Sequence, residues 1–242
     1  MVTLESILER DNLNRAYKHV KANKGGPGVD GMTVDKLSDY LRTHAAEIVE
    51  TVKAGKYIPQ PVRRVMIPKE EKGKFRPLGI PTATDRVIQQ AIAQKLSEEY
   101  EPVFSDHSHG FRPHRSCQTA IDEALVVANE GYVWIVDLDV SKFFDTVNHS
   151  KLLQLLSDKL GDGRVISLIH KILRAPIQED DKVTPCQIGT PQGGPVSPVL
   201  ANIMLNELDH ELERGAPSEL PSFNIALEPD YCSKCNSTRR FC

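Results

Sequence analysis

Apolar residues recur every three or four positions over several stretches of the chain, which is the spacing of one helix face. Residues 4–23 follow this pattern until a glycine-rich run at 25–28 stops it. Thr33 can cap a second helix over about 38–53. Further helices are predicted for residues 84–96, 118–129, 149–160, 165–173 and 197–213. The pattern therefore predicts a chain built mainly from helices.

Three shorter runs have the β-branched content of strands. Residues 62–68 and 74–80 flank a turn at 70–73 and predict a basic β-hairpin. Residues 133–139 predict a third strand, which ends in carboxylates. Together the runs predict an α+β fold that is helix-rich, with a basic β-hairpin and a small antiparallel sheet.

The periodic pattern stops after residue 214. Residues 215–242 contain three prolines and no apolar period, which predicts a poorly ordered tail. Cys232, Cys235 and Cys242 suggest a zinc site, but four ligands are usual and no histidine follows His210. A shifted reading frame at the end of the gene would explain the same composition.

The composition is that of a globular protein. The chain has 242 residues, enough for one large or two small domains, with 40% hydrophobic and 26% charged residues. No long uncharged apolar run and no basic-then-apolar start are present, so we expect a cytoplasmic protein without a membrane span. Five cysteines do not indicate a disulfide scaffold in that compartment.

Basic residues are concentrated in one segment, although the net charge is −3. Between Lys53 and Arg76 the sequence has eight basic and two acidic residues. Such a stripe is typical of phosphate binding, and it is equally compatible with a solvated basic hairpin.

Carboxylates gather where the third predicted strand ends. Asp137 and Asp139 are two positions apart and would share one face of a strand. Oxygen ligands of this kind suit Mg²⁺. The alternative is that Asp137, Asp139 and Asp145 only end a strand and cap the next helix, and spacing alone favours that alternative.

Six blocks follow one another along the chain. They are residues 28–31 (GVDG), 67–69 (IPK) with 75–82 (FRPLGIPT), 85–86 (DR) with 89–91 (QQA), 109–113 (HGFRP), the Asp139 stretch 136–145, and 189–194 (GTPQGG) with 197–198 (SP) and 201–202 (AN). In this order and spacing they resemble the reverse transcriptase domain of group II intron-encoded reverse transcriptase/maturases, over about residues 10–213.

The resemblance implies the fingers and an incomplete palm of a right-hand polymerase. It divides the chain into an N-terminal helical extension (1–55), fingers with the basic hairpin (56–132), a partial palm (133–213) and an atypical tail (214–242). The implied activity is RNA-directed DNA polymerisation, with Mg²⁺ as cofactor and two-metal catalysis. The implied partners are an RNA template (group II intron RNA), a DNA primer and dNTPs.

The resemblance also implies a role for individual residues. Asp139 matches the first catalytic metal ligand, with the backbone carbonyl of Val140 beside it. Phe144 matches the aromatic ring beneath the incoming sugar, which would exclude a 2′-hydroxyl; a core aromatic is the alternative. Lys69 and Arg76 match the residues that grip the triphosphate, and solvated charges are the alternative.

Three arginines are expected at the template, and a glutamine at the nucleotide. Gln192 matches the residue that touches the incoming nucleotide, although its glycine-flanked loop could be only a tight turn. Arg112 and Arg115 would hold the template backbone or buttress the fingers. Arg63 is the third candidate for the template; it neighbours Arg64 on a strand, so at most one of the two faces it.

The sequence also departs from the family pattern. It contains no Tyr-x-Asp-Asp, which would supply the second catalytic carboxylate, and the match stops near Glu213. We therefore expect little or no polymerase activity from this chain alone. A non-catalytic module that binds intron RNA, or one half of a split enzyme, are the alternatives. Apolar surface left bare at 133–139 and 197–213 would favour aggregation or a homodimer.

Overall fold

The fold is helix-rich with one small sheet, in a computed structural model that describes residues 1–68, 73–132, 136–190 and 193–214. The helices are α1 (Leu4–Ile7), α2 (Arg10–Ala22), α3 (Val34–Lys53), α4 (Ala83–Tyr100), α5 (Cys117–Asn129), α6 (Phe143–Thr146), α7 (His149–Lys159), α8 (Gly163–Leu173) and α9 (Ser197–Glu213). The strands are β1 (Val62–Pro68), β2 (Phe75–Ile80), β3 (Ile177–Glu179) and β4 (Lys182–Thr184).

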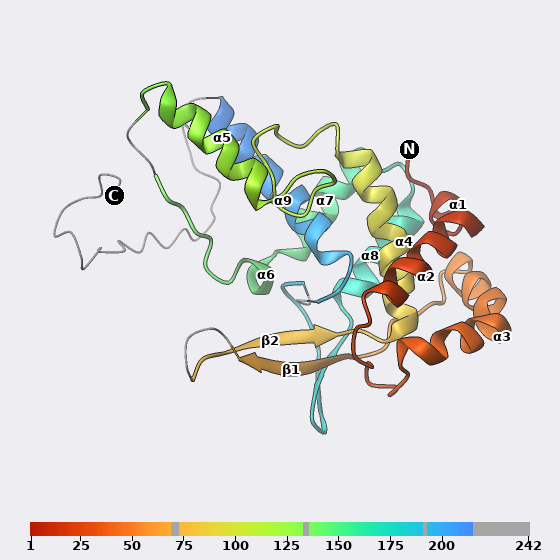
Figure 1. The fold of residues 1–242 in the computed structure, drawn as a ribbon. Coiled ribbons are helices and arrows are strands. Elements are labelled where there is room, and N and C mark those ends of the chain that lie inside the picture. The colour runs from red at the N-terminus through yellow and green to blue at the C-terminus, as the bar shows by residue number, and fades with distance from the viewer. Residues whose placement is uncertain (69–72, 133–135, 191–192, 215–242) are drawn as a thin grey trace.

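Helix α4 is the centre of the core. It contacts α1, α2, α3 and α9, and Figure 1 shows it in yellow between the red N-terminal helices and the blue α9. Ile92 and Leu96 of α4 are fully buried, as is Leu200 of α9. Each such side chain contributes about 1.5–3 kcal/mol by leaving water. The fold is therefore organised around a helix that is buried on most of its sides.

Side-chain caps set where several helices begin. The hydroxyl of Thr82 accepts a hydrogen bond from the Asp85 amide at the start of α4. Asn148 accepts from the Lys151 amide and so starts α7. Such caps satisfy backbone donors that a helix leaves free at its first turn. They place the start of α7 immediately after α6.

The sheet has the order β2-β1-β3-β4. Strands β1 and β2 form the predicted antiparallel hairpin, with Ile67 opposite Arg76. Strand β3 pairs in parallel with β1, where Val62 lies opposite Ile177, and then turns back into β4. The α+β class and the hairpin are confirmed, whereas the sheet is mixed because β3 enters beside β1 in the same direction. Strands of three residues are too short to show a period in the sequence.

The strand predicted at 133–139 is wrong over residues 136–139. Residues 136–140 have no regular secondary structure, and 133–135 lie outside the described residues. Val136 is 80% exposed and Leu138 is 44% exposed. A strand needs a neighbour for its backbone hydrogen bonds, and within the described ranges no strand lies alongside this segment.

Two further expectations need correction. The first helix is interrupted after Ile7 and begins again at Arg10. The apolar surface expected to be bare at 197–213 is mostly covered, because α9 packs against α4 and α7; Leu212 is an exception at 48% exposure. The predicted tail at 215–242, with its cysteines, lies outside the described residues. Across the ranges that are described, no helix has the length and apolar character of a membrane span.

Candidate functional site

Strand β2 separates two cavities. Arg76 and Leu78 line a cavity of about 560 Å³, Gly79 lines a second cavity of about 340 Å³ on the other side, and Pro77 lines both. This division follows from the strand, in which successive side chains point to opposite faces. Phe144 of the short helix α6 lines both cavities. The fold thus brings two of the predicted nucleotide-binding residues, Arg76 and Phe144, to one cavity.

The walls of the larger cavity come from separate parts of the chain. Besides β2 and α6 they include the end of α2 with the loop after it, one side of α4, the loop before α5, and the turn that starts α9. Arg76 is exposed, and within the described part of the chain its guanidinium makes no ion pair. The other two predicted nucleotide-binding residues, Lys69 and Gln192, lie outside the described residues.

Two glycines let the turn before α9 pack closely against its neighbours. Gly193 has a φ of +120°, and a Cβ there would lie 2.3 Å from the carbonyl oxygen of Gly79. At Gly194 a Cβ would lie 2.6 Å from Oε1 of Gln89. At Gly193 only a residue without a side chain allows this approach, because the facing atom is backbone, whereas at Gly194 the facing atom is the end of a side chain. The glycines therefore bring the turn against the protein's own β2 and α4, which closes one side of the cavity.

Arg86 is a charged wall residue to which the sequence reasoning gave no role. It is 8% exposed, and its Nη2 donates to the carbonyl of Gly26 at 3.0 Å. Its Nε is buried without a partner. Burial lowers the pKa of this guanidinium, and the charge of Asp30 acts in the opposite sense. A guanidinium in a cavity wall places a positive charge there, which suits an anionic ligand.

Phe111 is a second wall residue that the sequence reasoning passed over. Its ring is 74% exposed and lines the larger cavity, and its backbone has a positive φ of 55°. The neighbouring Gly110 carbonyl accepts a hydrogen bond from Nδ2 of Asn202 at 2.8 Å. Both residues belong to sequence blocks quoted above, and that membership was the only signal available.

Arg63 and Arg64 point to opposite sides of the hairpin, as their adjacency predicts. The guanidinium of Arg63 lies beside Gly26, and its Nε is buried without a partner. Arg64 lines the smaller cavity and forms an ion pair with Glu179 at 3.6 Å. Of the two, Arg63 is on the side of the loop that borders the larger cavity.

Asp139 is exposed and lines neither cavity. The carbonyl of Val140 accepts a hydrogen bond from the Phe143 amide at 3.2 Å. Within the ranges that the structure describes, no group of three or more histidine, cysteine, aspartate or glutamate side chains is arranged to hold a metal. The role of Asp139 as a metal ligand therefore remains a prediction, and the described residues do not complete a metal site around it.

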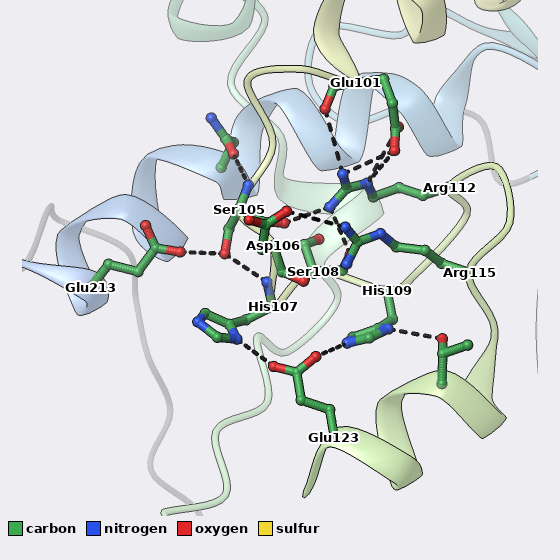
Figure 2. A network of polar contacts seen from close by, with 12 residues as sticks. Glu101, Ser105, Asp106, His107, Ser108, His109, Arg112, Arg115, Glu123 and Glu213 are labelled. Carbon is green, nitrogen blue, oxygen red and sulfur yellow. Dashed lines mark hydrogen bonds and ion pairs between the residues drawn. The ribbon is translucent and has the colours of Figure 1, made fainter. Parts of the chain in front are cut away.

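Arg112 is the centre of the polar network in Figure 2. Its side chain is 3% exposed, and Nη2 pairs with the Glu101 carboxylate at 2.9 Å. Nη1 donates to the carbonyls of Ser105 at 2.5 Å and Ser108 at 2.8 Å. Of the two roles expected for Arg112, this geometry favours the buttress, since its guanidinium is directed at the protein.

The same network attaches α5 to the preceding loop. His109 pairs with Glu123 through Nε2 at 2.8 Å, and His107 pairs with the other carboxylate oxygen. The hydrogen bond that His107 donates to the Glu123 carboxylate raises the pKa of His107, and the bonds that Glu123 accepts from both histidines lower the pKa of Glu123. Arg115, the other expected template residue, pairs with Asp106 at 3.3 Å.

Comparisons with known proteins identify the family. The sequence family described as "Reverse transcriptase (RNA-dependent DNA polymerase)" matches residues 67–226. The chain is 39% identical over 237 residues to the group II intron-encoded protein LtrA of Lactococcus lactis, which covers 97% of this chain and 39% of that protein. The chain belongs to the reverse transcriptases, and among them to the group II intron-encoded reverse transcriptase/maturases, as the sequence blocks predicted.

Other relatives agree with this assignment. Protein YkfC of Escherichia coli is 36% identical over 215 residues, covering 86% of this chain and 56% of that protein. An uncharacterized 91 kDa protein in the cob intron of Schizosaccharomyces pombe is 36% identical over 232 residues, covering 93% of this chain and 26% of that protein. The chain thus spans between about a quarter and somewhat over half of the length of these relatives.

A solved structure shows the same fold. A chain of the partial Cas6-RT-Cas1–Cas2 complex superposes with a TM-score of 0.58 at 23% identity, over 87% of this chain and 35% of that chain. At this identity the likeness concerns the fold alone. It agrees with the predicted fingers and partial palm.

Proposed function

We propose that this chain forms the nucleotide- and template-binding part of an RNA-directed DNA polymerase of group II intron maturase type. Such an enzyme adds dNTPs to a DNA primer on an RNA template. The observation that carries the proposal is that Arg76 and Phe144, from segments far apart in sequence, line one cavity of about 560 Å³. Family membership supplies the reaction class.

The two cavity residues would divide the work of binding a nucleotide. The exposed guanidinium of Arg76, together with Lys69, would hold the triphosphate, because its fork matches phosphate oxygens. The ring of Phe144 would lie beneath the sugar and leave no room for a 2′-hydroxyl. Gln192 would contact the incoming nucleotide and the template. Arg86 adds a second positive charge to the same wall.

We propose some ligands of a metal site, but not a complete site. Mg²⁺ is the expected cofactor, and Asp139 with the Val140 carbonyl would be among its ligands. Mg²⁺ demands near-octahedral coordination by oxygens, and the described residues hold no group of three or more ligating side chains that could supply it. We therefore assign binding rather than phosphoryl transfer to these residues, and expect little or no primer extension by this chain alone.

The test measures the dissociation constant of a fluorescently labelled dATP, with binding monitored by fluorescence anisotropy. Arg76→Ala should weaken binding at least about tenfold, the loss of a charge-assisted pair of hydrogen bonds, and Arg76→Lys should restore part of it. Arg42→Ala, at an exposed ion pair of α3, is the control. Equal affinity of the Arg76→Ala variant and the unaltered chain would refute the proposed site.

Catalysis needs its own measurement. Primer extension with Mg²⁺, dNTPs and an RNA template should give little or no product with this chain. Extension that Asp139→Ala abolishes would contradict this expectation. Extension that returns only with a co-purifying partner chain would favour the split-enzyme alternative.

A second candidate function is RNA binding without catalysis. It is favoured by the exposed basic hairpin, which also presents Phe75 at 56% and Met66 at 48% exposure. The logarithm of the binding constant for intron RNA should fall linearly with the logarithm of the salt concentration. Arg63→Ala should reduce the steepness of this salt dependence by about one unit, as for one lost phosphate contact. Arg42→Ala should leave the steepness unchanged. Analytical ultracentrifugation of the same preparation measures its molecular mass and so tests the expected homodimer.

A further inference from the structure

The segment that leads into the glycine turn is bound to the short helix that carries Phe144. The Thr190 amide donates to the Phe144 carbonyl at 2.6 Å. The Gly189 amide donates to the Val147 carbonyl at 2.9 Å. These two bonds join residues that are more than forty positions apart in sequence. We call this contact between residues 189–190 and residues 144–149 the clasp.

Gly189 brings the two halves of the clasp as close as backbones can approach. Its φ is +85°, a region that favours glycine. A Cβ at this position would lie 2.8 Å from the carbonyl oxygens of both Phe144 and Asp145. Any side chain there would push the segment away from α6. The spacing of the clasp therefore depends on a bare backbone.

His149 completes the clasp from the other side. It is 8% exposed, and its Nε2 lies 2.6 Å from the carbonyl oxygen of Gly189. Because a carbonyl only accepts, Nε2 is the nitrogen that carries the proton. The cap at Asn148 fixes the start of α7, and so the position of this imidazole. Gly189 is thus held through its amide by Val147 and through its carbonyl by His149.

The clasp lies next to both cavities. Phe144, Gly189 and Thr190 line the smaller cavity, and Phe144 also lines the larger one. The chain beyond Thr190 reaches Gly193, which packs on Gly79 of β2, the strand that carries Arg76. A shift of the clasp would therefore change the position of the Phe144 ring relative to the Arg76 side of the cavity.

We propose that His149 is a positioning residue for nucleotide selection: by holding the Gly189 carbonyl it sets the height of the Phe144 ring in the nucleotide cavity. The inference rests on the proposed function of that cavity. Loss of the hydrogen bond lets the ring move and admits a 2′-hydroxyl, while the triphosphate contact at Arg76 persists. His149 thereby acts on the choice between dNTP and rNTP rather than on the strength of triphosphate binding.

The test compares His149→Leu, which removes the donor, with His149→Gln, whose Nε2 can replace it. His170→Leu is the matched control, since His170 is half-buried in α8 and makes no side-chain hydrogen bond within the described ranges. Far-UV circular dichroism confirms that each variant is folded. The readouts are dissociation constants for dATP, ATP and inorganic tripolyphosphate, and amide hydrogen exchange in residues 143–147 and 186–190.

In His149→Leu we expect the preference for dATP over ATP to fall roughly fivefold, and clasp amides to exchange roughly five- to tenfold faster, as for one lost hydrogen bond. Tripolyphosphate affinity should stay within about twofold, which a general loss of structure would not allow. His149→Gln should restore the preference. An unchanged preference in His149→Leu, or equal losses for all three ligands, would overturn the inference.

The proposed function of the cavity and the role of His149 give different results when they fail. If the unaltered chain binds neither nucleotide, the proposed function fails and the role in selection fails with it, while exchange rates still show whether His149 holds Gly189. If the unaltered chain binds dATP in preference to ATP and His149→Leu retains that preference, only the inference about His149 fails.

Discussion

The hydroxyl of Tyr57 donates a hydrogen bond to Oδ1 of Asp85 at 2.5 Å. The other carboxylate oxygen accepts from the Thr82 hydroxyl at 2.5 Å and from the Gln60 amide at 3.2 Å. Asp85 is 3% exposed, and burial raises the pKa of its carboxyl group. The contact ties the chain entering β1 to the start of α4. The hairpin that carries Arg76 is therefore anchored on the central helix.

Removing the hydroxyl of Tyr57 should destabilise the fold. Tyr57→Phe leaves Asp85 buried with one donor fewer, and we expect the free energy of unfolding to fall by about 1–3 kcal/mol. Urea denaturation measures the change. Tyr40→Phe, at an exposed ring stacked on His44, should change it by less than about 0.5 kcal/mol. Equal stabilities of the two variants would show that the Tyr57 bond contributes nothing.

Asp162 should make stability depend on acid pH. It accepts hydrogen bonds from the Arg164 side chain and from the Leu4 amide, and these lower its pKa from 3.8 to about 2. A carboxyl with a lowered pKa stabilises the folded state above its unfolded pKa of 3.8, and this contribution is lost as pH falls through about 2. After solvent screening we expect about 1 kcal/mol.

The variant Asp162→Asn tests this pH dependence. The unfolding free energy of the unaltered chain should fall between pH 5 and pH 2, and the curve of the variant should be flatter over that range. Asp181→Asn, at an exposed position between β3 and β4, should reproduce the unaltered curve. Parallel curves for Asp162→Asn and the unaltered chain would count against the assignment.

Replacing Gly193 with alanine should reduce the free energy of unfolding more than replacing Gly131 with alanine. Both residues have positive φ, +120° and +96°, but only at Gly193 would a Cβ meet backbone, 2.3 Å from the Gly79 carbonyl. We expect Gly193→Ala to cost about 2–4 kcal/mol, from backbone strain and overpacking together. Gly131→Ala should cost about 1–2 kcal/mol from strain alone. Thermal unfolding compares them, and equal costs would exclude the clash as the cause.

Arg112 and Arg115 should separate a buttress from a template contact. Arg112→Ala removes the partner of the half-buried Glu101 carboxylate and of two backbone carbonyls, and we expect a loss of about 2–4 kcal/mol in unfolding free energy. Arg115→Ala should cost less than about 1 kcal/mol, because Asp106 is 95% exposed. RNA affinity is measured at a temperature where both variants remain folded. A larger loss of affinity for Arg112→Ala than for Arg115→Ala would restore the template role.

Several elements could be predicted because their information is local. The run 62–68 is β1 with the predicted bounds, and 197–213 is α9 with the predicted bounds. Pattern and caps act within a few residues, so a single sequence suffices for them. The strand predicted at 133–139 depended instead on a neighbouring strand, and in the described part of that segment none pairs with it.

The site residues divide in a similar way. The sequence blocks singled out Arg76 and Phe144 as nucleotide-binding residues, and their roles remain predictions. Arg86 belongs to one of these blocks without a role assigned to it, and His149 belongs to none; the side chains of both are buried against loops distant in sequence. No local pattern shows that a polar side chain will meet a particular backbone carbonyl.

The sequence by itself determined the family, the helix-rich α+β class and the basic hairpin, because ordered blocks and local periodicity are present in any single chain. Only the tertiary structure decided that Arg76 and Phe144 share a cavity, that Arg112 is directed inward, and that Gly189 lies between Val147 and His149. Those relations depend on packing between segments far apart in sequence, where glycines allow backbones to approach and buried polar groups must find partners.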